Sequence, residues 1–151
     1  MKKYFIFMLI VCLALFSLTS CKSELEKKLT EDEMEQIVFD ALFSIYAAFE
    51  NPDATVNLTM NGSLMTATFT NTVIKVVPEN YEDVDFQHLL GAVLNGTVTA
   101  DNGTGTATCD VTIQCKGDKV HTVVFTSKDD DPEVKITIDG QVYTTTDPFW
   151  F

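Results

Sequence analysis

The chain has 151 residues, of which 46% are hydrophobic and 21% are charged, and its net charge is −12 at pH 7. This length is enough for one domain with a substantial core and too short for two. All ten cationic side chains are lysines, so the sequence lacks the arginine-containing basic surface that nucleic-acid-binding proteins use for phosphates. These properties exclude nucleic acid as a partner, and they predict repulsion from anionic lipid headgroups.

The first twenty residues have the pattern of a secretory signal peptide. Two lysines follow Met1, an apolar stretch runs from Tyr4 to Leu18, and two small residues precede Cys21. The apolar stretch is about 15 residues long, whereas a membrane-spanning helix needs roughly 20. The residues Leu18-Thr19-Ser20-Cys21 resemble the lipobox of bacterial lipoproteins.

This resemblance implies export, removal of a signal peptide at residues 1–20, and a diacylglycerol on Cys21. The protein would then be lipid-anchored at the cell envelope. Lys22 stands where an Asp would retain such a protein at the inner membrane, so the resemblance implies the outer membrane in a host with two membranes. An ordinary signal peptide with an incidental cysteine is the alternative interpretation. Residues 21–29 would form a short charged tether.

A helix is predicted to begin after Thr30 and to end at Asn51-Pro52. Thr30 and Glu33 have the spacing of a capping box. One apolar face has helical spacing: Met34, Ile37, Val38, Ala41, Leu42, Ile45, Ala48 and Phe49. A second apolar ridge comprises Phe39, Phe43 and Tyr46, and the remaining polar stripe comprises Glu33, Gln36, Asp40 and Ser44. Because this helix has more than one apolar face, we expect a curved sheet to wrap around it; a partner or ligand on the second ridge is the alternative.

From Thr55 onward the sequence alternates apolar and polar residues and is rich in Thr and Val, as β-strands are. Strands are predicted over residues 54–60, 64–77, 93–100, 105–116, 119–127, 133–138 and 141–146. Asn-Gly or Asp-Gly pairs indicate turns at 61–62, 95–96 and 139–140. Two further turns are expected at 101–103 and 116–119.

Two hairpin registers follow from these turns. In the first hairpin Leu58 would pair with Met65, which puts the apolar residues on one face. Around the turn at 116–119, Cys115 would pair with Val120. A short helix that begins at Asp85 and carries Phe86, Leu89 and Leu90 is also predicted.

These elements predict an α+β fold. An N-terminal amphipathic helix would pack on a curved antiparallel β-meander of about six or seven strands. Helix and sheet would form a single domain over residues 30–151.

The sequence contains no recognisable catalytic or metal-binding motif, and no cofactor is expected. Cys109 and Cys115 lie on one apolar face, too far apart in a straight strand for a disulfide, so both are predicted to be free core thiols. A sharp bend at 110–114 would permit the disulfide. His121 is predicted to be a surface residue. The acidic run 129–133 is interpreted as a solvated turn rather than a calcium loop.

The chain ends with Phe149, Trp150 and Phe151, which would promote aggregation if they stayed exposed. We expect this tail to fold back on the core, and an interaction site is the alternative. A non-catalytic binding or interaction domain at the cell envelope is the favoured function. A carrier of an apolar ligand, held between helix and curved sheet, is the second hypothesis, and an enzyme with scattered site residues is the third. The partner would accordingly be a protein or an apolar ligand.

Overall fold

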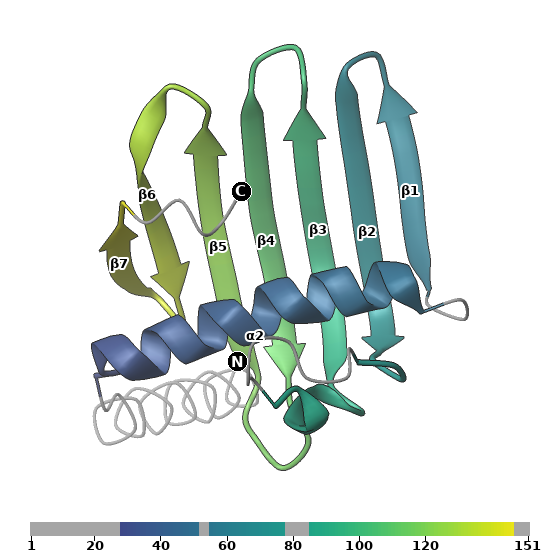
Figure 1. Cartoon of the computed structure of the whole chain (residues 1–151), viewed down its shortest axis with the longest axis vertical. Helices are drawn as coiled ribbons and strands as arrows, with labels where there is room; N and C mark the ends of the chain where they lie inside the picture. Colours follow the sequence, from purple (N-terminus) through teal and green to yellow (C-terminus); the bar gives the residue numbers. More distant parts are fainter. Residues whose placement is uncertain (1–27, 52–54, 78–84, 147–151) are drawn as a thin grey trace, which may run out of the picture.

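The structure, a computed structural model, describes residues 28–51, 55–77 and 85–146. One α-helix packs on one face of a seven-stranded antiparallel sheet, whose strands follow one another in chain order from β1 to β7 (Figure 1). The strands are β1 Val56–Asn61, β2 Leu64–Val73, β3 Val93–Asp101, β4 Thr106–Gln114, β5 His121–Lys128, β6 Asp131–Ile138 and β7 Gln141–Thr145. The predicted α+β class with a β-meander is confirmed, and the sheet is open at both edges.

The helix α2 spans Glu31–Glu50 and begins as the sequence predicts. The Glu33 N–H donates to the Thr30 hydroxyl at 3.2 Å, and the Thr30 N–H donates to the Glu33 carboxylate at 2.8 Å. This reciprocal pair is a complete capping box, which satisfies donors that the first helical turn leaves free. Asn51 caps the C-terminal end, before the proline that cannot continue the helix.

The helix crosses the strands from the β7 edge to the β1 side (Figure 1). Near its start, the Tyr143 hydroxyl donates to Glu35 at 2.9 Å. Near its end, the rings of Phe49 and Phe69 meet edge-to-face with centroids 5.8 Å apart. α2 therefore contacts elements that lie at opposite ends of the meander.

Small residues on α2 bring the helix close to the sheet. Ala41 and Ser44 are fully buried, and Ala48 is nearly so. They face a core of aliphatic strand residues, which includes Leu94, Val111, Val123 and Ile138. The assignment of Ser44 to a polar stripe is therefore wrong, because the buried arc of the helix is wider than its apolar residues indicated.

The second apolar ridge is partly covered, in a way that the sequence did not predict. Phe43 stacks on Phe86 with ring centroids 4.4 Å apart, and Phe39 stacks on the same ring at 6.0 Å. Phe86 precedes a short 3-10 helix, η1 Gln87–Leu89, and is almost completely buried. The N-cap of η1 is Phe86, one residue after the predicted Asp85, although the Asp85 carboxylate accepts a hydrogen bond from the Gln87 N–H at 2.9 Å. A connecting segment, rather than the sheet, covers Phe39 and Phe43, and Tyr46 is left 55% exposed.

Two of the expected hairpin registers are wrong, with different consequences. Leu58 pairs with Ala67 rather than Met65, a shift of two residues that leaves every side chain on its expected face. In the β4–β5 hairpin, Ile113 pairs with His121, which is one residue away from the predicted register. A one-residue shift reverses the faces of a strand. His121 is consequently buried, at 9% exposure, and Val124 lies on the outer surface.

The Asn95-Gly96 pair lies inside β3 and is not a turn. Opposite it, the β2–β3 register shifts between Phe69 and Thr72. Asn71 has a φ of 47° there, and its N–H donates to the Asn95 side chain at 2.7 Å. A Cβ on Gly96 would collide with the neighbouring backbone of β4, so glycine is required by close packing of strands. The Asn-Gly pair marks an irregularity in the sheet.

Candidate functional site: the β1 edge of the sheet

The β1–β2 hairpin lies in a stretch without charged residues. Residues 54–74 contain no Asp, Glu, Lys, Arg or His, although 21% of the whole chain is charged. Thr, Asn and Ser supply the polar groups of this stretch. One edge of the sheet is thus uncharged in an otherwise strongly acidic protein.

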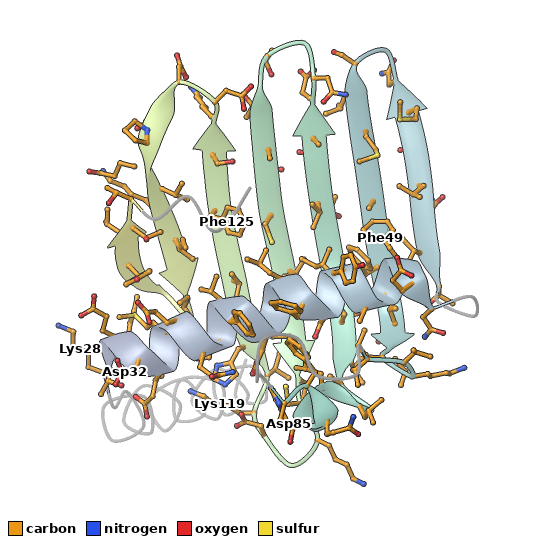
Figure 2. The ribbon with its side chains drawn as sticks, viewed as in Figure 1. Lys28, Asp32, Phe49, Asp85, Lys119 and Phe125 are labelled. Carbon is orange, nitrogen blue, oxygen red and sulfur yellow. The ribbon has the colours of Figure 1, made fainter. Side chains whose placement is uncertain are left out.

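Several large apolar side chains are exposed on the helix side of this hairpin. Leu58 is 52% exposed and Met60 is 69% exposed, and Met60 pairs with Met65, which is 39% exposed. Phe49, at 45% exposure, lies on the last turn of α2, and its ring contacts Phe69 of the same hairpin (Figure 2). We call Phe49, Leu58, Met60 and Met65 the hairpin patch. Grouped exposed apolar residues of this kind mark interaction sites more often than isolated ones do.

The outer edge of β1 has no neighbouring strand within the described part of the chain. Its residues after Val56 are all exposed, and the strand has no proline, no charge and no bulge, the features that usually protect an edge from pairing. The opposite edge differs. There β7 is one residue shorter, and the Leu29 N–H donates to the Gln141 side chain at 3.0 Å. β1 is the better template for an added strand.

A second candidate is a pocket of about 540 Å³ between α2, η1 and the β4–β5 turn. Its lining includes Asp40, His88 and Cys115. One imidazole nitrogen of His88 lies 2.8 Å from the Asp40 carboxylate, and the other lies 3.0 Å from the Asp85 carbonyl oxygen. Both nitrogens therefore face acceptors, an arrangement that suits a protonated ring.

The pKa values of His88 and Cys115 are unfavourable for nucleophilic catalysis in this pocket. Burial lowers the pKa of His88, but hydrogen bonds and negative charges from Asp40 and Asp85 raise it more, and the net pKa lies above its ordinary 6.5. Burial, with the charges of Asp40 and Asp118, raises the pKa of the Cys115 thiol to about 11. The thiol is protonated at neutral pH, and His88 has no free nitrogen with which to accept its proton. The pocket lacks an activated Cys–His pair.

His121 has a structural role at the same end of the sheet. Its ring lies 2.8 Å from the Asp139 carboxylate, which also accepts a hydrogen bond from the Thr122 N–H at 2.8 Å. Burial raises the pKa of Asp139, but the hydrogen bonds from Thr122 and His121 and the charge of Lys119 lower it more, to below its ordinary value. These contacts join the start of β5 to the β6–β7 turn.

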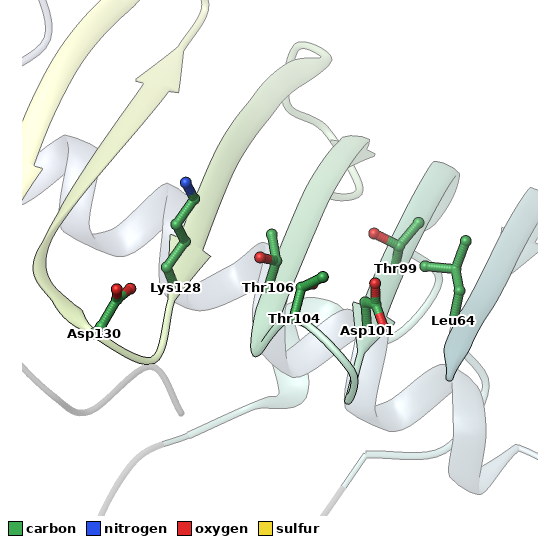
Figure 3. Close-up of a pocket in the computed structure, with 7 residues that line it drawn as sticks. All are labelled: Leu64, Thr99, Asp101, Thr104, Thr106, Lys128 and Asp130. Atoms are coloured by element: carbon green, nitrogen blue, oxygen red, sulfur yellow. The ribbon is translucent and has the colours of Figure 1, made fainter. Parts of the chain in front are cut away.

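A third hollow, of about 500 Å³, lies at the far ends of the strands on the face away from α2 (Figure 3). Its charged groups are Asp101, Lys128 and Asp130. Asp101 accepts a hydrogen bond from Ser63 at 2.5 Å, and this bond lowers the pKa of the carboxyl group. The hollow is polar and open, and the Asp101 carboxylate in it already accepts a hydrogen bond from Ser63.

The same outer face carries a row of threonines. Register pairs connect five of them across five strands, from β1 to β5: Thr59, Thr66, Thr99, Thr108 and Thr126. The hydroxyls of Thr99 and Thr108 lie 2.5 Å apart. Such cross-strand hydrogen bonds stabilise a sheet, and they explain this face without a ligand.

The remaining predicted site residues have different outcomes. Cys109 and Cys115 are both free, as predicted; Cys109 is a core residue, whereas Cys115 is only partly buried. Within the described ranges, no group of three or more His, Cys, Asp and Glu side chains is arranged to hold a metal ion. The same part of the chain contains no helix that is long and apolar enough to cross a membrane. Cys21 and the tail residues Phe149, Trp150 and Phe151 lie outside the described residues.

The sequence placed Leu58 and Met60 on one face of a hairpin, which is correct, but it did not identify that face as exposed. The absence of charge over residues 54–74 was the available signal. Comparisons with known proteins add no further guide. No protein-family model, no curated protein and no solved structure matches this chain.

Proposed function

We propose that this protein is a bacterial lipoprotein whose domain is a non-catalytic interaction module at the cell envelope. The signal peptide at residues 1–20 is removed, and Cys21 carries the lipid that holds the protein at the outer membrane of a host with two membranes. A short tether leads to α2, the N-terminal amphipathic helix of the domain, which packs on a curved sheet. The β1 edge and the hairpin patch form the contact surface.

The observation that carries this proposal is the combination of an unpaired edge with exposed apolar side chains in an uncharged stretch. Leu58 and Met60 are more than half exposed, and within the described residues no strand pairs with the edge beside them. Leaving such a surface in water is unfavourable, whereas an added strand pairs its backbone and buries its side chains together. The rest of the domain is acidic and avoids anionic headgroups, so the lipid alone provides the membrane contact.

Two observations favour this function over the alternatives. Catalysis by Cys115 and His88 is disfavoured by a protonated thiol and by ring nitrogens that already face acceptors. A carrier is disfavoured because Ala41, Ser44 and Ala48 pack directly against the sheet and are almost completely buried. An apolar ligand between helix and sheet would have to displace these contacts.

Methionine oxidation in intact cells tests the contact surface. Cells and purified full-length protein are treated with the same mild oxidant, and the sulfoxide at each methionine is measured by mass spectrometry. We expect Met60 and Met65 to be oxidised several-fold more slowly in cells than in dilute purified protein. Met34, which is buried in α2, serves as the internal control and is slow in both. Rapid oxidation of Met60 in both samples, several-fold faster than that of Met34, would show that the patch is free in cells and would refute the proposed surface.

A further inference from the structure

We propose that the β1 edge pairs with the β1 edge of a second copy of this chain, in an antiparallel dimer. This deepens the proposed function and rests on it, because it names the partner of the same surface. The two sheets would join into one continuous sheet across the new pair of strands. A two-fold axis perpendicular to the sheet relates the copies, which is the commonest symmetry of soluble oligomers.

The strand is self-complementary in a register centred on Leu58. With Leu58 opposite Leu58 of the second copy, Val56 stands opposite Met60, and Asn57 stands opposite Thr59. Apolar side chains then meet apolar ones on the helix side, and polar side chains meet polar ones on the outer side. Shifting this register by one residue would pair the two faces wrongly. Two-residue shifts keep the faces, and among these registers we propose the one centred on Leu58, which places Met60 of each copy opposite Val56 of the other.

The same register buries the most exposed members of the hairpin patch. Met60 of each copy lies opposite Val56 of the other, and Val56 is the register neighbour of Phe69, whose ring contacts Phe49. A methionine side chain is long and flexible enough to pack near such an aromatic group. Leu58 and Met60 would thus leave water on both copies together.

The distribution of charge also favours a second copy. Each chain has a net charge of −12, so self-association through most surfaces would bring carboxylates together. Residues 54–74 carry no charge. Antiparallel pairing places the uncharged turn after Asn61 beside the end of α2 in the other copy, so Glu50 does not meet its own equivalent. The edge lets two acidic molecules approach with little repulsion.

The β1–β1 pairing is complete with two copies, because it leaves no β1 edge free for a third, and it is compatible with a lipid anchor on each copy. Pairing β1 with β7 of another copy would instead build an open-ended filament, and at β7 Leu29 bonds Gln141 and Glu35 bonds Tyr143. In the symmetric dimer both α2 helices lie on the same face of the sheet. The starts of both α2 helices therefore lie on one face of the joined sheet, which is compatible with lipid anchors on both chains in the same membrane.

Cysteine cross-linking of the full-length chain in membranes tests the register. Residues opposite one another in an antiparallel pair have Cα atoms about 4.5–5.5 Å apart, within the range of a disulfide. After mild oxidation we expect Leu58→Cys to form most of its protein into a reducible adduct of twice the monomer mass. Thr59→Cys, which points to the other face and lies diagonal to its equivalent, should give several-fold less. Val142→Cys, on β7 and more exposed than Leu58, should give no more than the parent chain, which retains Cys109 and Cys115.

A second measurement does not depend on the introduced cysteine. The detergent-solubilised parent chain should have the mass of a dimer by light scattering, Met60→Lys should be monomeric, and Val142→Lys should remain a dimer. A monomeric parent chain, or equal adducts at positions 58 and 142, would overturn the dimer. A Leu58→Cys adduct with a protein of another mass would overturn self-pairing and leave the interaction surface standing. Absence of any adduct, together with unprotected Met60 in cells, would overturn both.

Discussion

The buried hydroxyl of Ser44 offers the most direct test of how α2 packs. Among the residues that the structure describes, its oxygen has no hydrogen-bond partner, although the side chain is completely buried. Replacing Ser44 with Ala removes this hydroxyl and keeps the Cβ that contacts the sheet. We expect Ser44→Ala to stabilise the protein.

The magnitude follows from three contributions. Burying a hydroxyl without a partner costs about 1–3 kcal/mol, which the substitution recovers. Alanine is favoured over serine inside a helix by about 0.5 kcal/mol. The small void left by the oxygen costs less than about 1 kcal/mol. The net gain is on the order of 1–2 kcal/mol, which raises the thermal midpoint of a domain of this size by roughly 3–8 °C.

Thermal and urea unfolding followed by circular dichroism measure this gain. Ala41→Ser is the matched reverse substitution, because Ala41 is equally buried and lies on the same side of α2. It adds a buried hydroxyl and should lower the midpoint by a similar amount. Ser44→Asp should prevent stable folding, since it would bury an unpaired charge. A midpoint for Ser44→Ala at or below that of the parent would refute this reasoning and show that the hydroxyl is satisfied in solution.

Three further predictions concern the anchor, the tail and pH. Cys21→Ser should release a folded domain from membranes, because the acyl chains supply nearly all the membrane affinity, and a cleaved variant that still fractionates with membranes would contradict the lipid anchor. Deletion of residues 149–151 should lower the thermal midpoint by several degrees, since burial of a large aromatic side chain contributes about 1.5–3 kcal/mol; an unchanged midpoint would assign the tail to binding instead. The raised pKa of His88 stabilises the parent fully below pH 6.5, and this stabilisation disappears as pH rises through the higher folded-state pKa. His88→Gln should lose it, so the difference in thermal midpoint between parent and variant should shrink at alkaline pH. A difference that grows with pH would contradict this prediction.

The sequence predicted the elements of this fold well because their local signals agree with their packing. The capping box at Thr30 and the alternation within each strand set α2 and all seven strands close to their observed bounds. Registers were harder, because a turn sequence permits several loop lengths. The β4–β5 turn differs by one residue from the expected loop, and that single residue moved His121 from the surface to the core.

Other differences arose from contacts between distant parts of the chain. Ser44 is polar and yet buried because small residues are needed where α2 approaches the sheet. Gly96 follows an asparagine, as glycines in turns do, but here glycine is needed because the backbone of β4 leaves no room for a side chain. The exposure of Leu58 and Met60 depends on where α2 crosses the sheet, which no local pattern specifies. The uncharged stretch that contains them was visible in the sequence.

The path of α2 across the meander has a consequence for the order in which the protein assembles. Each strand pairs with the strand just before it in the chain, so the sheet can grow one strand at a time as the chain emerges. α2 is synthesised before the strands, but Glu35 in its first half can accept its hydrogen bond only after Tyr143, 108 residues later, has been synthesised. Until then the helix has an apolar face without its full sheet, the kind of transient surface that promotes aggregation. Because α2 packs mainly on β3 to β6, a nascent chain stopped before these strands leaves the apolar face of the helix uncovered, and that is a form to which a chaperone would bind.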